Sequence, residues 1–261
     1  TTGANNVGIG SGALGANTTG AYNTAVGVKS LFFNVTGGDN VAVGDFALYS
    51  NTVSNNTAVG SDTLIANTTG TGNSAVGAVA LDANTTGANN VAFGYQALTA
   101  NTTGATNVAV GDSALQSVTT GSGNVGVGQA SGGQGAMINI TTESNRAVFG
   151  HNSITNAYVK VAFTVTSDAR DKMNFEEVPH GLSFVNQLKP VKFNFKKSRE
   201  NATPHGRTKY GFKAQDILAL EGDNPIIIDD ENEDSLKAVE SHLLPVLTKA
   251  IQELSAQVTA L

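Results

Sequence analysis

The 261-residue sequence contains no cysteine and no tryptophan, and only 14% of its residues are charged. Without cysteine the chain has no disulfide bond, no thiolate metal ligand and no cysteine nucleophile. Its net charge of −6 argues against a phosphate-binding surface, so we expect no nucleic-acid partner. No uninterrupted apolar run approaches the roughly 18 residues of a membrane-spanning helix, so we expect no membrane insertion.

Charge, glycine and proline divide the chain near residue 166. Residues 1–166 carry 9 charged side chains and 26 of the 30 glycines, whereas residues 167–261 carry 27 charged side chains and all 5 prolines. We therefore predict a repetitive shaft over 1–128, a β-rich fibre tip or transition over 129–166, and a separate domain over 167–261. The first residues already lie within the repeat, so we expect the chain to be a piece of a longer protein.

A repeat of 16 or 17 residues fills the first part of the chain. Each unit contains an Asn, then a three-residue run that ends at a Gly, and in most units a Leu four residues after that Gly. The closing glycines are Gly10, Gly27, Gly44, Gly60, Gly77, Gly94, Gly111 and Gly128. A second Asn follows the Leu by three residues in six units, at Asn17, Asn34, Asn51, Asn67, Asn84 and Asn101.

The repeat unit predicts a short strand followed by turns. Its three-residue run, for example Val41-Ala42-Val43, alternates branched and small side chains with a period of two. One unit is too small to bury its apolar face alone, so the units must stack into a solenoid of parallel strands. Asparagines that recur at one position are expected to stack into a ladder of amide groups.

The Asn-Thr-Ala-Val-Gly run at 23–27 resembles the head repeats of trimeric autotransporter adhesins. The resemblance implies a left-handed parallel β-roll with one coil per repeat and three chains side by side. The repeat is longer here, and an interwoven three-chain β-helix is the alternative. A single narrow roll buries little apolar surface, so we expect a homotrimer in either case.

The period is lost after Gly128. Three later segments alternate apolar and polar residues and are predicted to be strands joined by polar turns, at 137–140, 146–150 and 158–165. We interpret these segments as the narrowed tip of the shaft.

The sequence Thr-Ser-Asp-Ala-Arg-Asp-Lys at 166–172 resembles the Ser-Asp-x-Arg-x-Lys signature that opens the endosialidase-type intramolecular chaperone of phage tail fibres and tailspikes. Further similar stretches lie at 181–185, 188–193, 210–216 and 249–254. The resemblance covers 167–261 and implies an α+β domain with a C-terminal helix. It also implies that the domain trimerises the fibre and then cleaves itself off between Thr166 and Ser167.

The resemblance assigns Ser167 as the nucleophile and Lys172 as the general base, with Asp168 and Arg170 as supporting candidates. A serine hydroxyl needs an adjacent base, and the four histidines are scattered in the sequence, so a Ser-Lys dyad suits the residues available. Lys172 must lose a proton to act as a base, which requires burial or a nearby cation such as Arg170. Attack on the carbonyl of Thr166 would give an ester that water hydrolyses.

Two further features of the last domain lead to expectations. The basic residues between 192 and 213 flank a predicted hairpin tip at 201–206. In the resembling family such a protrusion grips the neighbouring fibre domain, and a solvated hairpin is the alternative. The acidic run 229–234 is interpreted as a solvated loop and not a calcium loop, because glycine is missing from the sixth position. We accordingly expect no metal and no cofactor.

The C-terminal segment predicts a helix that begins between Ser241 and Leu244, because proline is tolerated only in the first helical turn. Its apolar residues recur at alternating spacings of three and four, at Leu244, Leu247, Ile251, Leu254, Val258 and Leu261. This apolar seam would pack either in a coiled coil between chains or in the core of its own domain.

We interpret the whole as the distal part of a phage tail fibre in the virion, used for receptor binding on the host surface. The expected receptor is a glycan or an outer-membrane component, and the chaperone domain is expected to be released or retained after assembly in the host cytoplasm. A polysaccharide-degrading tailspike is an alternative, but the six acidic residues of 1–166 are too sparse to pair readily around a glycosidic bond. A bacterial trimeric adhesin is another, but it gives no reason for the signature at Ser167.

Overall fold

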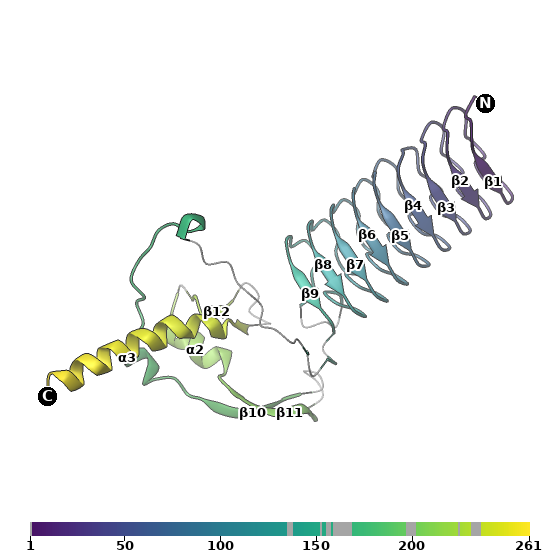
Figure 1. Ribbon diagram of the computed structural model, residues 1–261. Coiled ribbons are helices and arrows are strands. Elements are labelled where there is room, and N and C mark those ends of the chain that lie inside the picture. Colours follow the sequence, from purple (N-terminus) through teal and green to yellow (C-terminus); the bar gives the residue numbers. More distant parts are fainter. Residues whose placement is uncertain are drawn as a thin grey trace. The chain divides into compact units, whose positions relative to one another are not determined.

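The computed structural model divides the chain into two compact units, residues 1–154 and 155–261, each with its own core (Figure 1). It describes residues 2–134, 138–151, 153–154, 158, 169–196, 202–223, 225–230 and 236–261, apart from the side chains of Asp171, His205, Lys237 and Glu240.

The first unit is a β-solenoid in which nine short strands form one parallel sheet in sequence order (Figure 1). The strands are β1 (Val7–Ile9), β2 (Thr24–Val26), β3 (Val41–Val43), β4 (Thr57–Val59), β5 (Ser74–Val76), β6 (Val91–Phe93), β7 (Val108–Val110), β8 (Val125–Val127) and β9 (Ala147–Phe149). Each strand pairs in register with the next coil of the same chain, so Ala25 lies opposite Ala42. One chain therefore closes every coil, as in a single-chain roll and not as in an interwoven three-chain helix.

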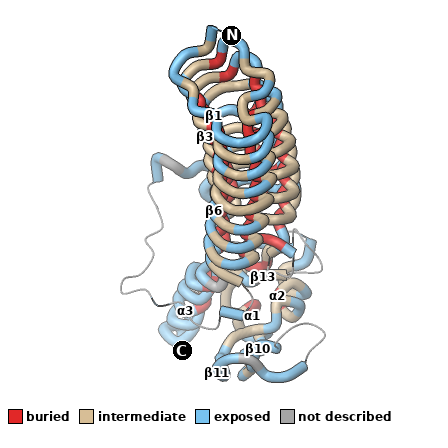
Figure 2. The backbone as a smooth tube through the Cα atoms, turned by 90° about the vertical axis from the view of Figure 1, so that its right-hand side faces the viewer, coloured by how far each residue is buried: buried red, intermediate tan, exposed pale blue. Residues whose placement is uncertain are grey.

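Alanine and leucine form the core of the solenoid. The middle residue of strands β2 to β9 is buried, and Ala42, Ala58 and Ala75 are fully buried, whereas Val41 and Val43 beside Ala42 are 37% and 36% exposed. Apart from Leu14 in the first coil, the leucines after the closing glycines are also fully buried, at Leu31, Leu48, Leu64, Leu81, Leu98 and Leu115. Figure 2 shows the buried residues recurring from coil to coil along the solenoid. The β-branched residues that flank each alanine consequently form outer columns.

Two columns of buried asparagine run along the solenoid and confirm the predicted ladder. In the first column the side-chain oxygen of Asn73 accepts the backbone N–H of Asn90 at 3.0 Å, and Asn90 Nδ2 donates to the carbonyl of Gly104 at 2.8 Å. In the second column Asn84 Nδ2 donates to Asn67 Oδ1 at 2.9 Å. The buried amides therefore find partners mainly in the adjacent coils.

Two constraints require glycine at the closing positions: the backbone conformation and the close approach of the next coil. Gly94 has a φ of 141°, a region that side-chain-bearing residues avoid. A Cβ atom at Gly94 would also collide with the carbonyl oxygen of Gly111 in the next coil. The regular spacing of glycine in the sequence thus reflects one conformational requirement met once in each coil.

Each coil also holds residues other than glycine in the left-handed backbone region. In the third coil Asp39, Phe46 and Leu48 have φ values of 57°, 57° and 53°. This conformation costs an L-residue roughly 1–2 kcal/mol, or about 3–6 kcal/mol for three residues in a coil. Contacts between coils must offset that cost, so a single coil is unstable and the stack forms cooperatively.

The solenoid continues past Gly128. β9 pairs in parallel with β8, and this last coil spans 22 residues. The predicted strand at 146–150 is confirmed by β9. The prediction of a strand at 137–140 was wrong for the described residues 138–140, which form no strand. They lie instead in the connection of the longer coil and place Ile140 in the solenoid core. The predicted strand 158–165 lies outside the described residues apart from Tyr158.

The second unit is α+β, as predicted. Its elements are η1 (Ala169–Asp171), α1 (Leu182–Val185), β10 (Val191–Lys196), β11 (Pro204–Gly211), α2 (Ala214–Glu221), β12 (Ile228–Asp229), β13 (Lys237–Ala238), η3 (Glu240–His242) and α3 (Leu243–Thr259). β10 and β11 form the predicted antiparallel hairpin, but the predicted tip at 201–206 was placed too late, because residues 204–206 already belong to β11, which pairs with β10. The connection between the two strands spans 197–203, of which 197–201 lie outside the described residues. The core contains Phe184, Ile217, Ile227, Ile228, Leu243 and Val246.

The C-terminal helix α3 begins at Leu243, within the predicted interval. It packs on its own unit through Leu243, Val246 and Ala250. The predicted seam lies on a different face, where Leu244 and Ile251 are 65% and 67% exposed. The seam as a whole is therefore not an intrachain core, because a second set of apolar positions spaced by three and four fills that role. Among the helices that the structure describes, none is long and apolar enough to cross a membrane.

Glu221 at the end of α2 organises the segment that leads into β12. Its carboxylate accepts the backbone N–H groups of Ile226, Ile227 and Ile228 at 2.9, 2.8 and 3.0 Å. Two of these isoleucines are almost fully buried in the core of the unit. One charged side chain thus satisfies three consecutive backbone donors at the core boundary.

The asparagine ladder leads to a prediction about two adjacent rungs. Asn84 is bonded by both neighbours in its column, whereas Asn101 is the last rung and its buried Oδ1 has no hydrogen-bond partner. Asn84→Val should destabilise the solenoid more than Asn101→Val, by about 1–2 kcal/mol, because it leaves additional buried amide groups unsatisfied. Denaturant unfolding of the full chain measures the difference, either as the free energy of unfolding or as the unfolding rate. Equal losses of stability in the two variants would show that the additional ladder bonds of Asn84 do not stabilise the solenoid.

Loss of the Glu221 carboxylate should destabilise the second unit. Glu221→Ala removes the shared acceptor of three backbone N–H groups, so we expect a loss of about 2–4 kcal/mol in the free energy of unfolding. The matched control is Gln215→Ala, an exposed position on the same helix. Thermal unfolding followed by helix circular dichroism measures both variants. An unchanged midpoint for Glu221→Ala would show that water replaces the carboxylate at no cost.

Candidate functional site

The predicted cleavage site falls within the second unit and precedes the first described helical turn of that unit, η1. Thr166, Ser167 and Asp168 are outside the described residues. Arg170 lies in η1, and Lys172 follows directly, with its backbone N–H bonded to the carbonyl of Ala169 at 3.2 Å. The structure therefore brings Arg170 and Lys172 onto one tight turn, and the pairing of Ser167 with Lys172 stays a prediction.

The environment of Lys172 bears on its predicted role as a base. The side chains of Lys172 and Arg170 are both exposed in the single chain. Of the two routes by which a lysine is made to lose its proton, burial is therefore not supplied by the part of this unit that the structure describes. A nearby cation or a second chain would have to supply the required environment.

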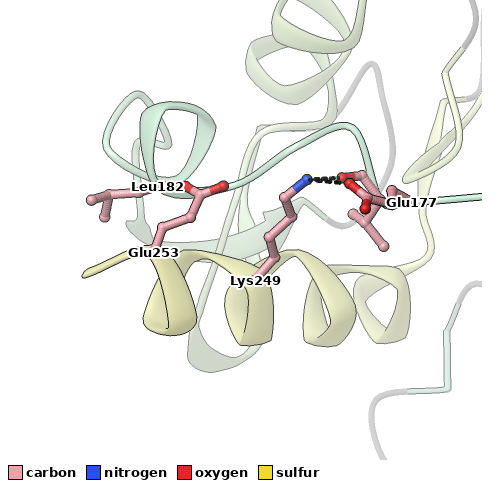
Figure 3. Close-up of polar contacts among 5 residues, drawn as sticks. Glu177, Leu182, Lys249 and Glu253 are labelled. Atoms are coloured by element: carbon pink, nitrogen blue, oxygen red, sulfur yellow. Dashed lines mark hydrogen bonds and ion pairs between the residues drawn. The ribbon is translucent and has the colours of Figure 1, made fainter. Parts of the chain in front are cut away.

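The segment after Lys172 is held by two charged residues of α3. Residues 173–177 are exposed, and the chain then reaches α1. Lys249 Nζ donates to the carbonyl of Val178 at 2.6 Å and lies 3.9 Å from Glu177 Oε2. One turn further along, Glu253 Oε2 accepts the backbone N–H of Leu182 at 2.7 Å. Figure 3 shows both side chains extending from α3 to this one stretch of backbone.

The sequence pattern did not identify Lys249 and Glu253 as parts of a site. They lie within the family-like stretch 249–254, and their partners lie 71 residues earlier. The one local signal is Gly181, where a Cβ atom would collide with the carboxylate of Glu253. Glycine before a short helix is too common to predict such a contact.

His180 has a structural contact. Its ring stacks on Phe184, with ring centroids 4.2 Å apart and planes at 23°. Phe184 is buried in the core of the second unit. The stack joins the backbone around Gly181 to that core.

Several carboxylates of the solenoid accept structural hydrogen bonds, two of them from the preceding or following coil. Asp45 accepts the N–H of Val28 at 2.9 Å, and Asp82 accepts the hydroxyl of Thr99 at 2.6 Å. Backbone N–H groups, above all that of Thr141, lower the pKa of Glu143. A general acid for glycoside hydrolysis needs a raised pKa, so Glu143 does not suit that role. Within the described ranges, no three His, Asp or Glu side chains gather closely enough to hold a metal ion.

Comparison with protein families adds independent information on this region. Comparisons with curated proteins and with solved structures found no match. The model of the family described as the chaperone of endosialidase, a family classed as a peptidase, matches residues 167–223. The match begins at Ser167 and supports an intramolecular chaperone and self-cleavage in general terms. Residues 167–223 are therefore similar to the endosialidase chaperone family.

Proposed function

We propose that this chain is the distal part of a trimeric phage tail fibre whose last domain drives assembly and then cleaves itself off between Thr166 and Ser167. Ser167 acts as the nucleophile, Lys172 as the general base, and the solenoid attaches the virion to a glycan or outer-membrane component of the host. The observation that carries the proposal is the family match that begins at Ser167. That residue also lies at the change in composition between 1–166 and 167–261.

The backbone of the solenoid explains why such a fibre would need a chaperone. Each coil contains left-handed residues, and its strand has only three residues with which to pair. The first coil to form therefore has a high free energy, and only stacking lowers the cost of the next one. A separately folded domain that holds chains together would raise the local concentration of coils and provide a nucleus.

The exposed apolar surfaces support assembly with two further copies of the chain. On α3 the seam residues Leu244, Ile251 and Val258 are about two-thirds exposed. On the solenoid the outer columns present Val43, Phe93 and other apolar residues along the whole sheet. These columns repeat once per coil, and another copy of the chain in the same register has apolar residues at the same repeat. Such a copy is therefore the simplest partner for this surface.

The proposed cleavage has two stages, attack by the Ser167 hydroxyl to form an ester and hydrolysis of that ester. Ser167 Oγ attacks the carbonyl carbon of Thr166 while Lys172 Nζ takes the hydroxyl proton. The C–N bond then breaks, the proton passes to the departing amine of Ser167, and an ester joins Thr166 to the Ser167 side chain. Water hydrolyses the ester, which leaves a carboxylate at Thr166 and a free amino terminus at Ser167. Neighbouring chains in the trimer would supply the desolvation that Lys172 lacks in the single chain.

The dyad leads to a prediction about two variants and a control. Ser167→Ala should abolish the fragment that starts at Ser167, and Lys172→Ala should slow its formation by about 10²–10⁴-fold, the usual contribution of a general base. Both variants should still trimerise, because assembly depends on packing. Lys189→Ala, an exposed lysine of the same unit, is the control and should cleave normally. Denaturing mass spectrometry gives the masses. Unchanged cleavage in Ser167→Ala would refute the assigned nucleophile.

Assembly should precede cleavage. Ile251→Asp places a charge on the seam and should give a monomer that leaves the Thr166–Ser167 bond intact, whereas Gln252→Asp, next to it on the helix, should assemble and cleave. A chain that lacks 167–261 from synthesis should aggregate, and a fibre that loses it after assembly should stay trimeric because its unfolding is slow. Light scattering and mass spectrometry test these outcomes. Cleavage in a proven Ile251→Asp monomer would show that assembly is not the trigger.

A further inference from the structure

We propose that Lys249 and Glu253 are positioning residues for the cleavage reaction, because they connect the assembly helix α3 to the segment that carries Lys172. The inference rests on the proposed function and adds to it a physical link between assembly and chemistry. Together the two side chains and the backbone groups of Val178 and Leu182 are called the clamp.

The clamp binds the backbone of one segment at two points, through two side chains of opposite charge. The ammonium group of Lys249 bonds a carbonyl oxygen at 2.6 Å, and the carboxylate of Glu253 bonds an N–H group at 2.7 Å. Residues 249 and 253 lie one helical turn apart and so extend from the same side of α3. Two charge-assisted bonds to groups four residues apart determine both the position and the direction of the segment.

The local sequence leaves room for the clamp. Gly181 has no side chain where a Cβ atom would meet the Glu253 carboxylate. The N–H that Glu253 accepts belongs to Leu182, the first residue of α1, where the helix has unpaired donors. The Lys249 side chain is 31% exposed, whereas Glu177 is 97% exposed, so the ion pair between them contributes little. The two backbone bonds therefore carry the contact.

The clamp is close to the reaction along the chain. Val178 lies six residues after Lys172, a distance of at most about 20 Å in an extended chain. The described residues from Lys172 to Glu177 are exposed and lie outside helices and strands, so the clamp and Val178 hold this segment to the unit's core. The position at which the clamp holds Val178 consequently limits the positions that Lys172 can occupy.

The clamp also lies on the helix that carries the assembly surface. Ile251 of the exposed seam lies between Lys249 and Glu253 in the sequence, and the helix is exposed at most positions beyond Ala250. An exposed helix end frays, and fraying would release Glu253 from Leu182. Packing of the seam against other chains would suppress the fraying and hold the clamp closed, so that the Lys172 segment is correctly placed only after assembly.

The test uses the full chain and separates positioning from assembly. Lys249→Met and Glu253→Leu remove one backbone bond each, and we expect trimers that cleave at the Thr166–Ser167 bond about 10- to 100-fold more slowly. Lys249→Arg and Glu253→Gln keep a donor and an acceptor and should restore most of the rate, which a general loss of stability would not predict. Thr248→Ala, an exposed neighbour on α3, is the control. Sedimentation reports the trimer, and mass spectrometry follows cleavage with time.

Each outcome decides the proposal. Trimers of Lys249→Met and Glu253→Leu that cleave at the wild-type rate would overturn it, as would slow cleavage that Lys249→Arg and Glu253→Gln fail to restore. Loss of the trimer in all four variants would assign the clamp to folding and would also overturn its positioning role. Failure of the proposed function looks different, because the wild-type trimer itself would then not cleave.

Discussion

The hydrogen bonding of each coil to the next is the interaction on which the solenoid depends. A coil contains several left-handed residues and buried amides, and both are tolerated because the adjacent coil supplies partners. The left-handed leucines are the same residues that fill the core. Strain and burial are therefore coupled at single positions, and neither the conformation nor the core exists in an isolated unit. Such a structure has a high barrier to its first coil and a low cost for each one after it.

The second unit is organised in the opposite way. Its core forms from α1, α2, α3 and the β12 segment without repetition, and charged side chains secure its connecting backbone at Glu221, Lys249 and Glu253. One face of α3 is used within the unit and another remains exposed. Under the proposed function, the exposed face would hold several chains together. Cleavage after assembly would leave the solenoid kinetically stable without its nucleus.

The parts of the candidate site differ in how far the sequence could identify them. Ser167 and Lys172 belong to a local signature and were identified through resemblance, with the family match beginning at the same serine. Lys249 and Glu253 could not be identified in this way, because a lysine or glutamate on a helix is common and the partner atoms are backbone groups 71 residues away. Backbone acceptors and donors have no sequence identity, so such contacts appear only when the elements pack.

The repeat by itself determined the parallel solenoid, the ladder of asparagines and the glycine positions, because each requirement recurs once per coil and leaves a visible period. The composition change near residue 166 likewise indicated a second, different unit. Only the tertiary structure decided that the middle residue of strands β2 to β9 points inward, that the predicted strand at 146–150 joins the solenoid sheet as β9, and which face of α3 packs within its own unit. A three-residue strand or an amphipathic helix has two usable faces, and the choice depends on the neighbours that each face meets in space.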